Sequence, residues 1–301
     1  MVDLNGDRVI ITGAGRGLGR AYALAAAGAG GKVVVNDRDV AEARAVAAEI
    51  VRAGGVAVAS RHAVDQPGEA RGLVDLAVAE LGGLDGLVLN AGLYHEALPW
   101  QEDVDLADRD VRVNVLGAIN CLTAASAVMV EAGRGSIVVA SSAGLLGSRR
   151  IMTYAATKGA VASLAFASAL DLAEHGVRVN AIAPVAITRM TRGAVGRRVV
   201  PVGAGQALLA GVEQRAPERV APLVTYLLSD AARGVTGQLI RFDGNRLAVF
   251  SQQAVADLPG LSADSWTTDS IAAAFGGPLA GALSPFGVER MPADAAASHP
   301  R

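Results

Sequence analysis

The sequence predicts an α/β fold in which a single doubly wound parallel sheet is flanked by helices. Short apolar runs of strand length alternate with alanine-rich stretches of helix length along most of the 301 residues. This alternation indicates parallel strands joined by right-handed crossovers. Hydrophobic residues make up 51% of the chain but aromatic residues only 4%. The core is therefore expected to be Ala, Val, Leu and Ile, which suits a sheet that is buried on both faces.

The expected elements follow one another in a regular order. The first strand is expected at residues 8–12, where an apolar run leads directly into a glycine-rich turn, and the first helix at 18–29. The same pattern then repeats along the chain. Further strands are expected at 32–36, 56–60, 87–90, 136–140, 178–183 and 239–242, and further helices at 40–53, 69–81, 105–131, 153–175 and 220–229.

The domain organisation is expected to be simple. The chain shows no internal repeat and no central linker, so we expect one domain over residues 1–250, including a substrate loop at 188–217. The pattern breaks down after about Phe250. Residues 251–301 are interpreted as a C-terminal extension, and its last part, 291–301, is expected to be disordered.

Composition and charge limit the possible partners. The net charge is −2 and no long basic block is present, which argues against nucleic acid. Cys121 is the only cysteine, so no intrachain disulfide can form, and its apolar surroundings favour a core residue over a reactive thiol. The sequence shows no secretory signal and no strongly apolar run of membrane-spanning length, which predicts a cytoplasmic protein. No metal is assigned, because His62, His175 and His299 lack metal-ligand spacing.

A glycine-rich turn between the first strand and the first helix predicts a dinucleotide site in a Rossmann-like fold. Gly13, Gly17 and Gly19 allow a tight turn and a close approach to a pyrophosphate. The following helix offers the phosphates its dipole and its free N–H groups. Arg16 and Leu18 lie in the same turn and are further candidate contacts. A plain tight turn is the alternative, but the strand before and the helix after it favour a nucleotide.

Asp37 bears on the choice of cofactor. It ends the second strand, 18 residues after Gly19. A carboxylate there can accept hydrogen bonds from the adenosine ribose hydroxyls and would repel a 2′-phosphate, so NAD is favoured over NADP. Arg16 and Arg38 are the counter-evidence, because either side chain could reach a phosphate.

The lysine content points to a second functional feature. The chain has 27 lysine and arginine residues, and only two of them, Lys32 and Lys158, are lysines. Lys158 follows Tyr154 by four positions. On a helix these two side chains share a face, so the ammonium would stabilise a phenolate and make Tyr154 a candidate acid/base. A lysine suits this role because its pKa can be tuned, whereas arginine stays charged. Taken alone, such a pair is more often an ordinary surface pair.

Three further motifs accompany the glycine turn and Tyr154-x₃-Lys158, namely Asn90-Ala91-Gly92, Asn114 and Ser141. Taken together, these features resemble the short-chain dehydrogenase/reductase family over about residues 5–248. The glycine spacing is that of the shorter, standard branch of the family. The resemblance implies a nicotinamide-dependent dehydrogenase or reductase acting on CH–OH groups.

The resemblance implies a catalytic tetrad. Ser141 precedes Tyr154 by 13 residues, whereas Ser142 is one residue too late. Ser141 would donate a hydrogen bond to the substrate carbonyl oxygen, and Tyr154 would exchange a proton with that oxygen. Lys158 would lower the pKa of the phenol and bind the nicotinamide ribose, and Asn114 would hold a water that links Lys158 to solvent. Without the resemblance, Ser141 would be interpreted as a strand-end cap and Asn114 as a satisfied polar group.

The resemblance also implies further cofactor contacts. Val185 stands where the family often has glycine, and Ala63 where it usually has aspartate. Backbone atoms of Ala63 and Val64 are therefore expected to contact the adenine, with Asp65 a weaker candidate. Thr188 would contact the carboxamide or the pyrophosphate. The remaining contacts implied by the resemblance are those of Asn90, Ala91, Gly92, Pro184 and Ile187.

A finer resemblance concerns the substrate. Several segments are similar to the (3R)-hydroxyacyl-CoA dehydrogenase portion of peroxisomal multifunctional enzymes and to bacterial relatives that act on steroids or CoA esters. This implies a secondary alcohol on a bulky apolar or CoA-linked substrate. The segments are 12–25, 33–37, 182–191, 217–237 and Trp266-Thr267-Thr268.

Two loops, 93–103 and 188–217, are expected to form the substrate pocket. Tyr94, His95 and Trp100 are candidate lining residues, with His95 more readily interpreted as structural or exposed than as catalytic. The second loop carries four arginines that either bind CoA phosphates or form a solvated surface, namely Arg189, Arg192, Arg197 and Arg198.

Alternatives to this function and assembly stay open at the level of sequence. The substrate could be another small or apolar alcohol, or the chain could be a non-catalytic NAD-binding sensor or scaffold. A homo-oligomer, dimer or tetramer, is expected through the helices at 105–131 and 153–175. The alanine-rich face of the second helix could instead pack within the chain.

Overall fold

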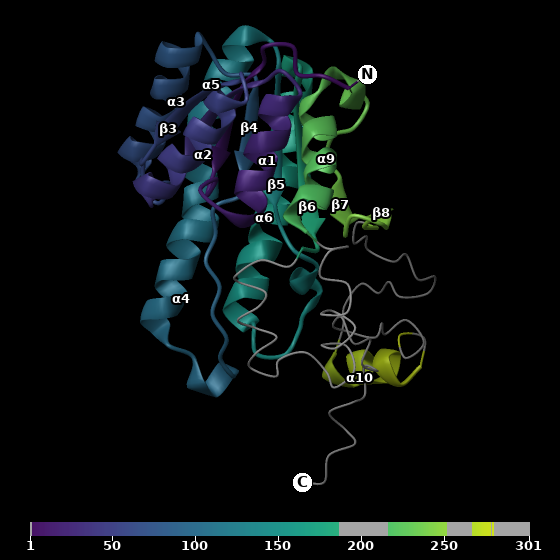
Figure 1. The fold of residues 1–301 in the computed structure, drawn as a ribbon. Helices are drawn as coiled ribbons and strands as arrows, with labels where there is room; N and C mark the ends of the chain where they lie inside the picture. The colour runs from purple at the N-terminus through teal and green to yellow at the C-terminus, as the bar shows by residue number, and fades with distance from the viewer. Residues whose placement is uncertain (1, 187–215, 252–266, 278, 280–301) are drawn as a thin grey trace.

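The computed structural model describes residues 2–186, 216–251, 267–277 and 279 (Figure 1). In this part of the chain, eight strands form one sheet in the order β3-β2-β1-β4-β5-β6-β7-β8. The first seven are parallel, and only β8 runs antiparallel to its neighbour β7. The strands are β1 (Arg8–Thr12), β2 (Lys32–Asn36), β3 (Val56–Ser60), β4 (Gly86–Leu89), β5 (Gly135–Ala140), β6 (Val177–Pro184), β7 (Leu239–Phe242) and β8 (Leu247–Val249).

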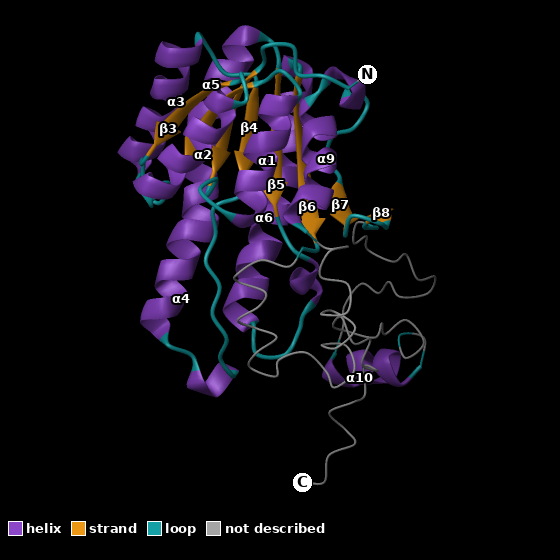
Figure 2. Cartoon of the chain, viewed as in Figure 1, coloured by secondary structure: helices purple, strands orange, loops and turns teal. Residues whose placement is uncertain are grey.

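Helices cover both faces of the sheet, as Figure 2 shows. One core cluster joins one face of the sheet to α1, α2 and α9, and a second joins the other face to α3, α5 and α6. The predicted doubly wound α/β fold is therefore confirmed. The helices are α1 (Gly17–Gly28), α2 (Val40–Arg52), α3 (Pro67–Leu81), α4 (Val104–Val111), α5 (Gly117–Ala132), α6 (Met152–Leu172), α9 (Pro217–Leu228) and α10 (Thr268–Gly276).

Local chemistry explains where these elements begin and end. The apolar residues of β1 and β2 are fully buried, as expected for strands covered on both faces. Asp39 precedes α2, and its carboxylate accepts a hydrogen bond from the backbone N–H of Glu42. Pro67 opens α3, and Gly82 ends it with a φ of 87°, a conformation that favours glycine.

The topology fixes where a ligand can bind. From β1 the chain builds outward through β2 and β3, then returns to β4 on the other side of β1. This reversal of strand order leaves a crevice beyond the carboxyl ends of β1 and β4, because the two connecting helices lie on opposite faces of the sheet. The predicted site residues at the ends of these strands therefore meet at one edge.

The helix expected at 105–131 contains a feature that the sequence pattern did not predict. Residues 104–132 are helical throughout, but Arg112–Leu116 (η2) forms a π-helical turn between α4 and α5. By length and composition alone this helix could cross a membrane. Here, however, Cys121 and Met129 are fully buried in the core of the sheet, so the helix covers one face of the fold.

One short strand was not predicted, and two segments discussed in the sequence analysis lie almost entirely outside the described residues. β8 was not predicted, because it has only three residues and two of them, Leu247 and Val249, are more than 60% exposed. The substrate loop at 188–217 falls almost entirely outside the described residues, as does the last segment, 291–301.

Candidate active site

The glycine turn packs directly against the end of β4. Gly13 and Gly17 have positive φ values of 63° and 54°, which side chains disfavour. A Cβ atom at Gly13 would lie 2.8 Å from Cα of Ala91, and one at Gly19 would collide with the carbonyl oxygen of Gly13. Glycine is therefore required here by space as well as by conformation.

Hydrogen bonds hold this contact together. Thr12 Oγ1 accepts hydrogen bonds from the backbone N–H groups of Asn90, at 3.0 Å, and Ala91, at 3.1 Å. Asn90 Nδ2 donates to the carbonyl oxygens of Thr12, at 3.0 Å, and Gly13, at 3.1 Å. The sequence predicted a role for Asn90 but gave no sign of the part that Thr12 plays.

The N-terminus of α1 is open toward the crevice. Arg16 provides no side-chain cap, and the first turn of α1 contains no acidic residue. The first backbone N–H groups of a helix have no acceptor within the helix, and its dipole favours negative charge. These features fit the pyrophosphate of a dinucleotide.

Asp37 stands beside this turn. Its Oδ2 accepts a hydrogen bond from the N–H of Gly15 at 3.0 Å, and its Oδ1 accepts one from the N–H of Asp39 at 3.0 Å. The residue is only 9% exposed. The structure thus places a fixed carboxylate next to the glycine turn, where the sequence predicted contact with a ribose.

Ala63 and Val64 follow β3 at the same edge of the sheet. The carbonyl oxygen of Val64 accepts a hydrogen bond from Asn120 Nδ2 at 3.1 Å. The N–H of Ala63 lies 3.4 Å from Glu69 Oε2. Both backbone groups therefore have partners within the chain, while Pro184 lies at the end of β6. Ile187 and Thr188 lie outside the described residues.

Tyr154 and Lys158 lie together near the start of α6. The ammonium nitrogen of Lys158 is 5.6 Å from the centre of the Tyr154 ring and donates to the carbonyl oxygen of Ala140 at 2.7 Å. Lys158 is only 6% exposed, and burial lowers its pKa to about 8. Burial raises the pKa of the Tyr154 phenol, and a hydrogen bond with Ser142 only partly offsets this.

The two serines after β5 have different surroundings. The hydroxyl of Ser141 donates to the backbone carbonyl oxygen of Lys158 at 2.7 Å. The Ser142 side chain is the one hydrogen-bonded to Tyr154, and it also accepts from the N–H of Gly144 at 3.1 Å. The structure therefore brings both serines to the end of β5, but the hydroxyl of the expected one, Ser141, donates its hydrogen to a backbone carbonyl oxygen.

Asn114 lies in the π-helical turn and is almost fully buried. Its Oδ1 accepts from the N–H of Leu93 at 2.7 Å, and its Nδ2 donates to the carbonyl oxygen of Leu93 and to Thr157 Oγ1. A small cavity beside it is lined by Thr12, Asn114 and Lys158, among others. Polar groups of this kind can hold a water, and the proton route expected at Asn114 stays a prediction.

The segment after β4 forms a wall beside the phenol. The rings of Tyr94 and Tyr154 meet edge to face, with their centres 4.9 Å apart, and Tyr94 donates to Glu96 at 2.7 Å. His95 was expected to be structural or exposed. It is mostly buried, and it contacts the carboxylates of Glu102 and Asp110. Trp100 is 77% exposed.

Comparisons with known proteins identify relatives along most of the chain. The family model for short chain dehydrogenase matches residues 7–197. A short-chain type dehydrogenase/reductase of Mycobacterium tuberculosis is 37% identical over 235 residues, which are 74% of this chain and 78% of that protein. The peroxisomal hydratase-dehydrogenase-epimerase of Saccharomyces cerevisiae is 32% identical over 86% of this chain but only 30% of its own length.

Solved structures agree with this relationship. A short chain dehydrogenase from Mycobacterium avium has a TM-score of 0.80 at 33% identity and covers 93% of this chain and 95% of its own. A 7α-hydroxysteroid dehydrogenase complexed with NADH and 7-oxo glycochenodeoxycholic acid has a TM-score of 0.73 at 33% identity, with coverages of 81% and 95%.

The close packing at Gly19 generates a first prediction. Replacing Gly19 with alanine should weaken binding of a nicotinamide dinucleotide, with NAD as the probe, at least about tenfold. The new methyl group would push the glycine turn away from its place at the helix N-terminus. Titration calorimetry or quenching of NADH fluorescence measures the dissociation constant.

Gly28 is the matched control, since it lies in the same helix and a Cβ atom there would meet no atom within 4 Å. Gly28→Ala should bind NAD normally and gain up to about 1 kcal/mol of stability. If a folded Gly19→Ala protein bound NAD as tightly as the Gly28→Ala protein, the nucleotide site would not be at this turn.

Proposed function

The chain belongs to the short-chain dehydrogenase/reductase family, and we propose that it is an NAD-dependent oxidoreductase that interconverts a secondary alcohol and a ketone. The proposal depends above all on the Tyr154–Lys158 pair at the edge of the crevice, in which the lysine is buried. A Cβ atom at Gly92 would lie 3.5 Å from the ammonium of Lys158. Because Asn90 and Ala91 contact the glycine turn, the acid/base pair and the nucleotide site adjoin one another.

The described residues fit a nicotinamide dinucleotide. The open N-terminus of α1 would receive the pyrophosphate, Asp37 the adenosine ribose, and Lys158 the nicotinamide ribose. Ala63, Val64, the 90–92 segment and Pro184 are proposed as further contacts, with Ile187 and Thr188 from the sequence. When bound, the nicotinamide supplies or accepts the hydride.

Tyr154 is proposed to move the proton. During alcohol oxidation its phenolate would accept the hydroxyl proton, and during ketone reduction its phenol would return that proton. Burial opposes the phenolate and raises the pKa of Tyr154. A positive charge nearby is needed to offset this effect, and Lys158 is the nearest candidate on the same helix face.

A serine hydroxyl is proposed to stabilise the charge that develops on the substrate oxygen. We propose Ser141 for this role, as the family resemblance implies. Its hydroxyl would have to rotate from the carbonyl of Lys158, its present acceptor. Ser142 would then keep its hydrogen bond with Tyr154 and tune the phenol. Asn114 is proposed to order the water that links Lys158 to solvent.

The preference for NAD over NADP is supported by Asp37. Its carboxylate is fixed by two backbone N–H groups beside the predicted position of the ribose. A 2′-phosphate placed there would meet a like charge held at short range, and like charges inside a protein repel strongly. Arg16 and Arg38 remain the residues that would favour NADP.

The proposed substrate is a secondary alcohol on an apolar or CoA-linked molecule. Two similarities support this choice: the yeast relative is named as a hydratase-dehydrogenase-epimerase of the peroxisome, and the solved relative holds a steroid. Tyr94 provides an aromatic wall next to Tyr154, which suits apolar contact. The four arginines proposed to bind CoA phosphates lie outside the described residues.

We also propose that the protein is a homo-oligomer. Apolar side chains are exposed on α6 and on the long helix that includes α5. Leu170 is 81% exposed, Met152 46%, Leu116 41% and Ile119 39%. We propose that these side chains face the same helices of a second copy of the chain, because contact there would remove their apolar surface from water. A light-scattering mass equal to that of one chain would contradict this proposal.

The acid/base role generates a second prediction. Tyr154→Phe should lower kcat by about 10³-fold while NAD binding stays unchanged, because only the proton-transferring hydroxyl is lost. Steady-state kinetics and NAD titration measure the two effects. Tyr226→Phe on α9 is the control and should be fully active. Substantial turnover by Tyr154→Phe would exclude the mechanism.

The same kinetic measurements distinguish the roles of Ser141 and Ser142. Ser141→Ala should cost about 10²-fold in kcat, because it removes the hydrogen bond to the developing oxyanion. Ser142→Ala should cost less and should shift the pH dependence of kcat toward alkaline pH, since its hydrogen bond lowers the pKa of Tyr154. The reverse order of effects would assign the oxyanion donor to Ser142.

Substrate and cofactor are tested together in a screen by NADH fluorescence. Hydroxyacyl-CoAs, hydroxysteroids and small secondary alcohols are each assayed with NAD and with NADP, and Tyr154→Phe serves as the blank. We expect NAD to be preferred and a CoA ester or steroid to have the highest kcat/KM. Equal kcat/KM for a hydroxyacyl-CoA and its free alcohol would exclude CoA recognition, and a preference for NADP would contradict the role of Asp37.

A further inference from the structure

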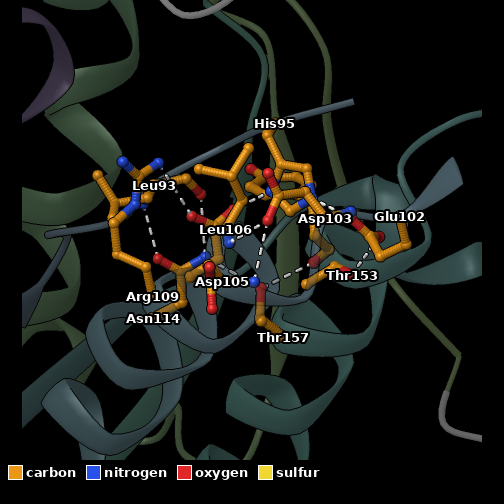
Figure 3. Close-up of polar contacts among 12 residues, drawn as sticks. Leu93, His95, Glu102, Asp103, Asp105, Leu106, Arg109, Asn114, Thr153 and Thr157 are labelled. Atoms are coloured by element: carbon orange, nitrogen blue, oxygen red, sulfur yellow. Dashed lines mark hydrogen bonds and ion pairs between the residues drawn. The ribbon is translucent and has the colours of Figure 1, made fainter. Parts of the chain in front are cut away.

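A histidine lies between two carboxylates next to the candidate active site. His95 Nδ1 is 2.8 Å from Asp110 Oδ2, and His95 Nε2 is 2.5 Å from Glu102 Oε1 (Figure 3). The His95 and Glu102 side chains are only 11% and 12% exposed, and that of Asp110 is fully buried. Among the described residues, no group of acidic, histidine or cysteine side chains is arranged to hold a metal ion.

Both contacts are hydrogen bonds to carboxylates when each ring nitrogen of His95 carries a proton. A carboxylate oxygen can only accept a hydrogen bond, and a neutral imidazole has only one N–H to donate. His95 can therefore satisfy Asp110 and Glu102 together only as an imidazolium, unless a carboxyl group takes up a proton. Asp110 Oδ1 has no hydrogen-bond partner in the described part of the chain, and the Arg109 guanidinium forms a longer ion pair with it at 3.7 Å. The imidazolium is therefore the nearer of the two cations that offset the charge of this buried carboxylate.

The cluster joins three segments around the phenol. His95 immediately follows Tyr94, whose ring contacts Tyr154. Asp110 belongs to α4. Glu102 uses its second oxygen, Oε2, to accept a hydrogen bond from Thr153 at 2.6 Å, one residue before Tyr154. The N-cap residue Ile151 provides no side-chain cap for α6. The hydrogen bond from Thr153 places the Glu102 carboxylate at the first turn of that helix, where the helix dipole favours negative charge.

The pKa of His95 follows from these neighbours. Burial by itself lowers the pKa, but the hydrogen bonds and charges of Glu102 and Asp110 outweigh it and raise the pKa above its ordinary value of 6.5. The other charged groups nearby are Arg109, beside Asp110, Asp103, whose N–H donates to Glu102, and Glu96, which accepts from Tyr94. Stability from the imidazolium is thus complete below about pH 6.5 and is lost as the pH rises through the raised pKa.

We propose that His95 is a positioning residue that holds Tyr94 against Tyr154 while its imidazolium bridges Asp110 and Glu102, so that the substrate side of the site loosens when the imidazolium loses its proton. The effect on catalysis rests on the proposed dehydrogenase function, whereas the link between His95 and the two tyrosines does not. Loss of the proton leaves one nitrogen facing a carboxylate oxygen without a hydrogen between them. One of the two bonds must then break.

Two substitutions distinguish a charge-dependent positioning role of His95 from a role in packing alone. His95→Gln retains a polar side chain but cannot carry the charge that bridges both carboxylates. Glu102→Gln should instead keep both hydrogen bonds of His95 after the imidazole loses its charge. Its amide oxygen can still accept from Thr153, and its NH₂ group can donate to a neutral imidazole that donates its own N–H to Asp110. His175→Gln is the matched control, because His175 is largely exposed beside Glu174.

The first measurement needs no substrate. The chain has four histidines and four tyrosines, so NMR of ring-labelled protein resolves His95 by comparison with His95→Gln. We expect the Tyr94 and Tyr154 signals to shift with the titration of His95, while Tyr22 and Tyr226 stay constant. Glu102→Gln should keep the two tyrosines in their low-pH state after His95 loses its charge. Titration of His95 without these tyrosine shifts would overturn the proposal.

The second measurement is the pH profile of kcat/KM with the best alcohol from the substrate screen. At pH 6, His95→Gln should raise KM for the alcohol about tenfold, leave KM for NAD unchanged, and approach wild type as the pH rises. A deficit that is the same at every pH would indicate packing alone and overturn the proposal. If no alcohol or ketone is turned over, the dehydrogenase function fails, but the NMR titration still decides the role of His95.

Discussion

The candidate site depends on the close contact between the glycine turn and the chain that leaves β4. Thr12 and Asn90 exchange hydrogen bonds across this contact, and the space between the two segments admits no Cβ atom at Gly13 or Gly19. The contact does two things at once. It opens the N-terminus of α1 toward the crevice, and it brings the 90–92 segment beside Lys158. A nucleotide on the first feature would therefore lie next to the second.

The π-helical turn places Asn114 near Lys158, where both residues line the same small cavity. Asn114 has three hydrogen bonds to Leu93 and Thr157, which link the segment after β4 to α6. A regular α-helix has 3.6 residues per turn, and one extra residue within a turn rotates the following positions around the axis. The turn at 112–116 lets Asn114 face the site while Cys121 and Met129 still face the core.

Much of this arrangement follows from sequence, but not all of it. The buried strands were predictable because β-branched runs such as those of β1 and β2 are separated by alanine-rich helices, and the glycine turn was predictable because only glycine tolerates its conformation. The π-helical turn left no signal, since its residues continue the helical pattern. The hydroxyl directions of Ser141 and Ser142 were equally unpredictable, because a rotation about one bond decides them. Asp110 gave no sign of burial, since an acidic residue on a helix is normally exposed.

The wall of the candidate site contains two largely buried basic side chains, Lys158 and His95, whose pKa values shift in opposite directions. Among the described residues Lys158 has no carboxylate partner, and burial lowers its pKa to about 8, which leaves its charge available for the proposed action on the phenol and the ribose. His95 has two carboxylate partners, so its pKa rises despite burial. A carboxylate beside Lys158 would fix its charge and compete with Tyr154 for it. A missing carboxylate beside His95 would remove the reason for its second proton. The placement of acidic residues near these two side chains thus distinguishes the proposed catalytic cation, Lys158, from the proposed positioning residue, His95.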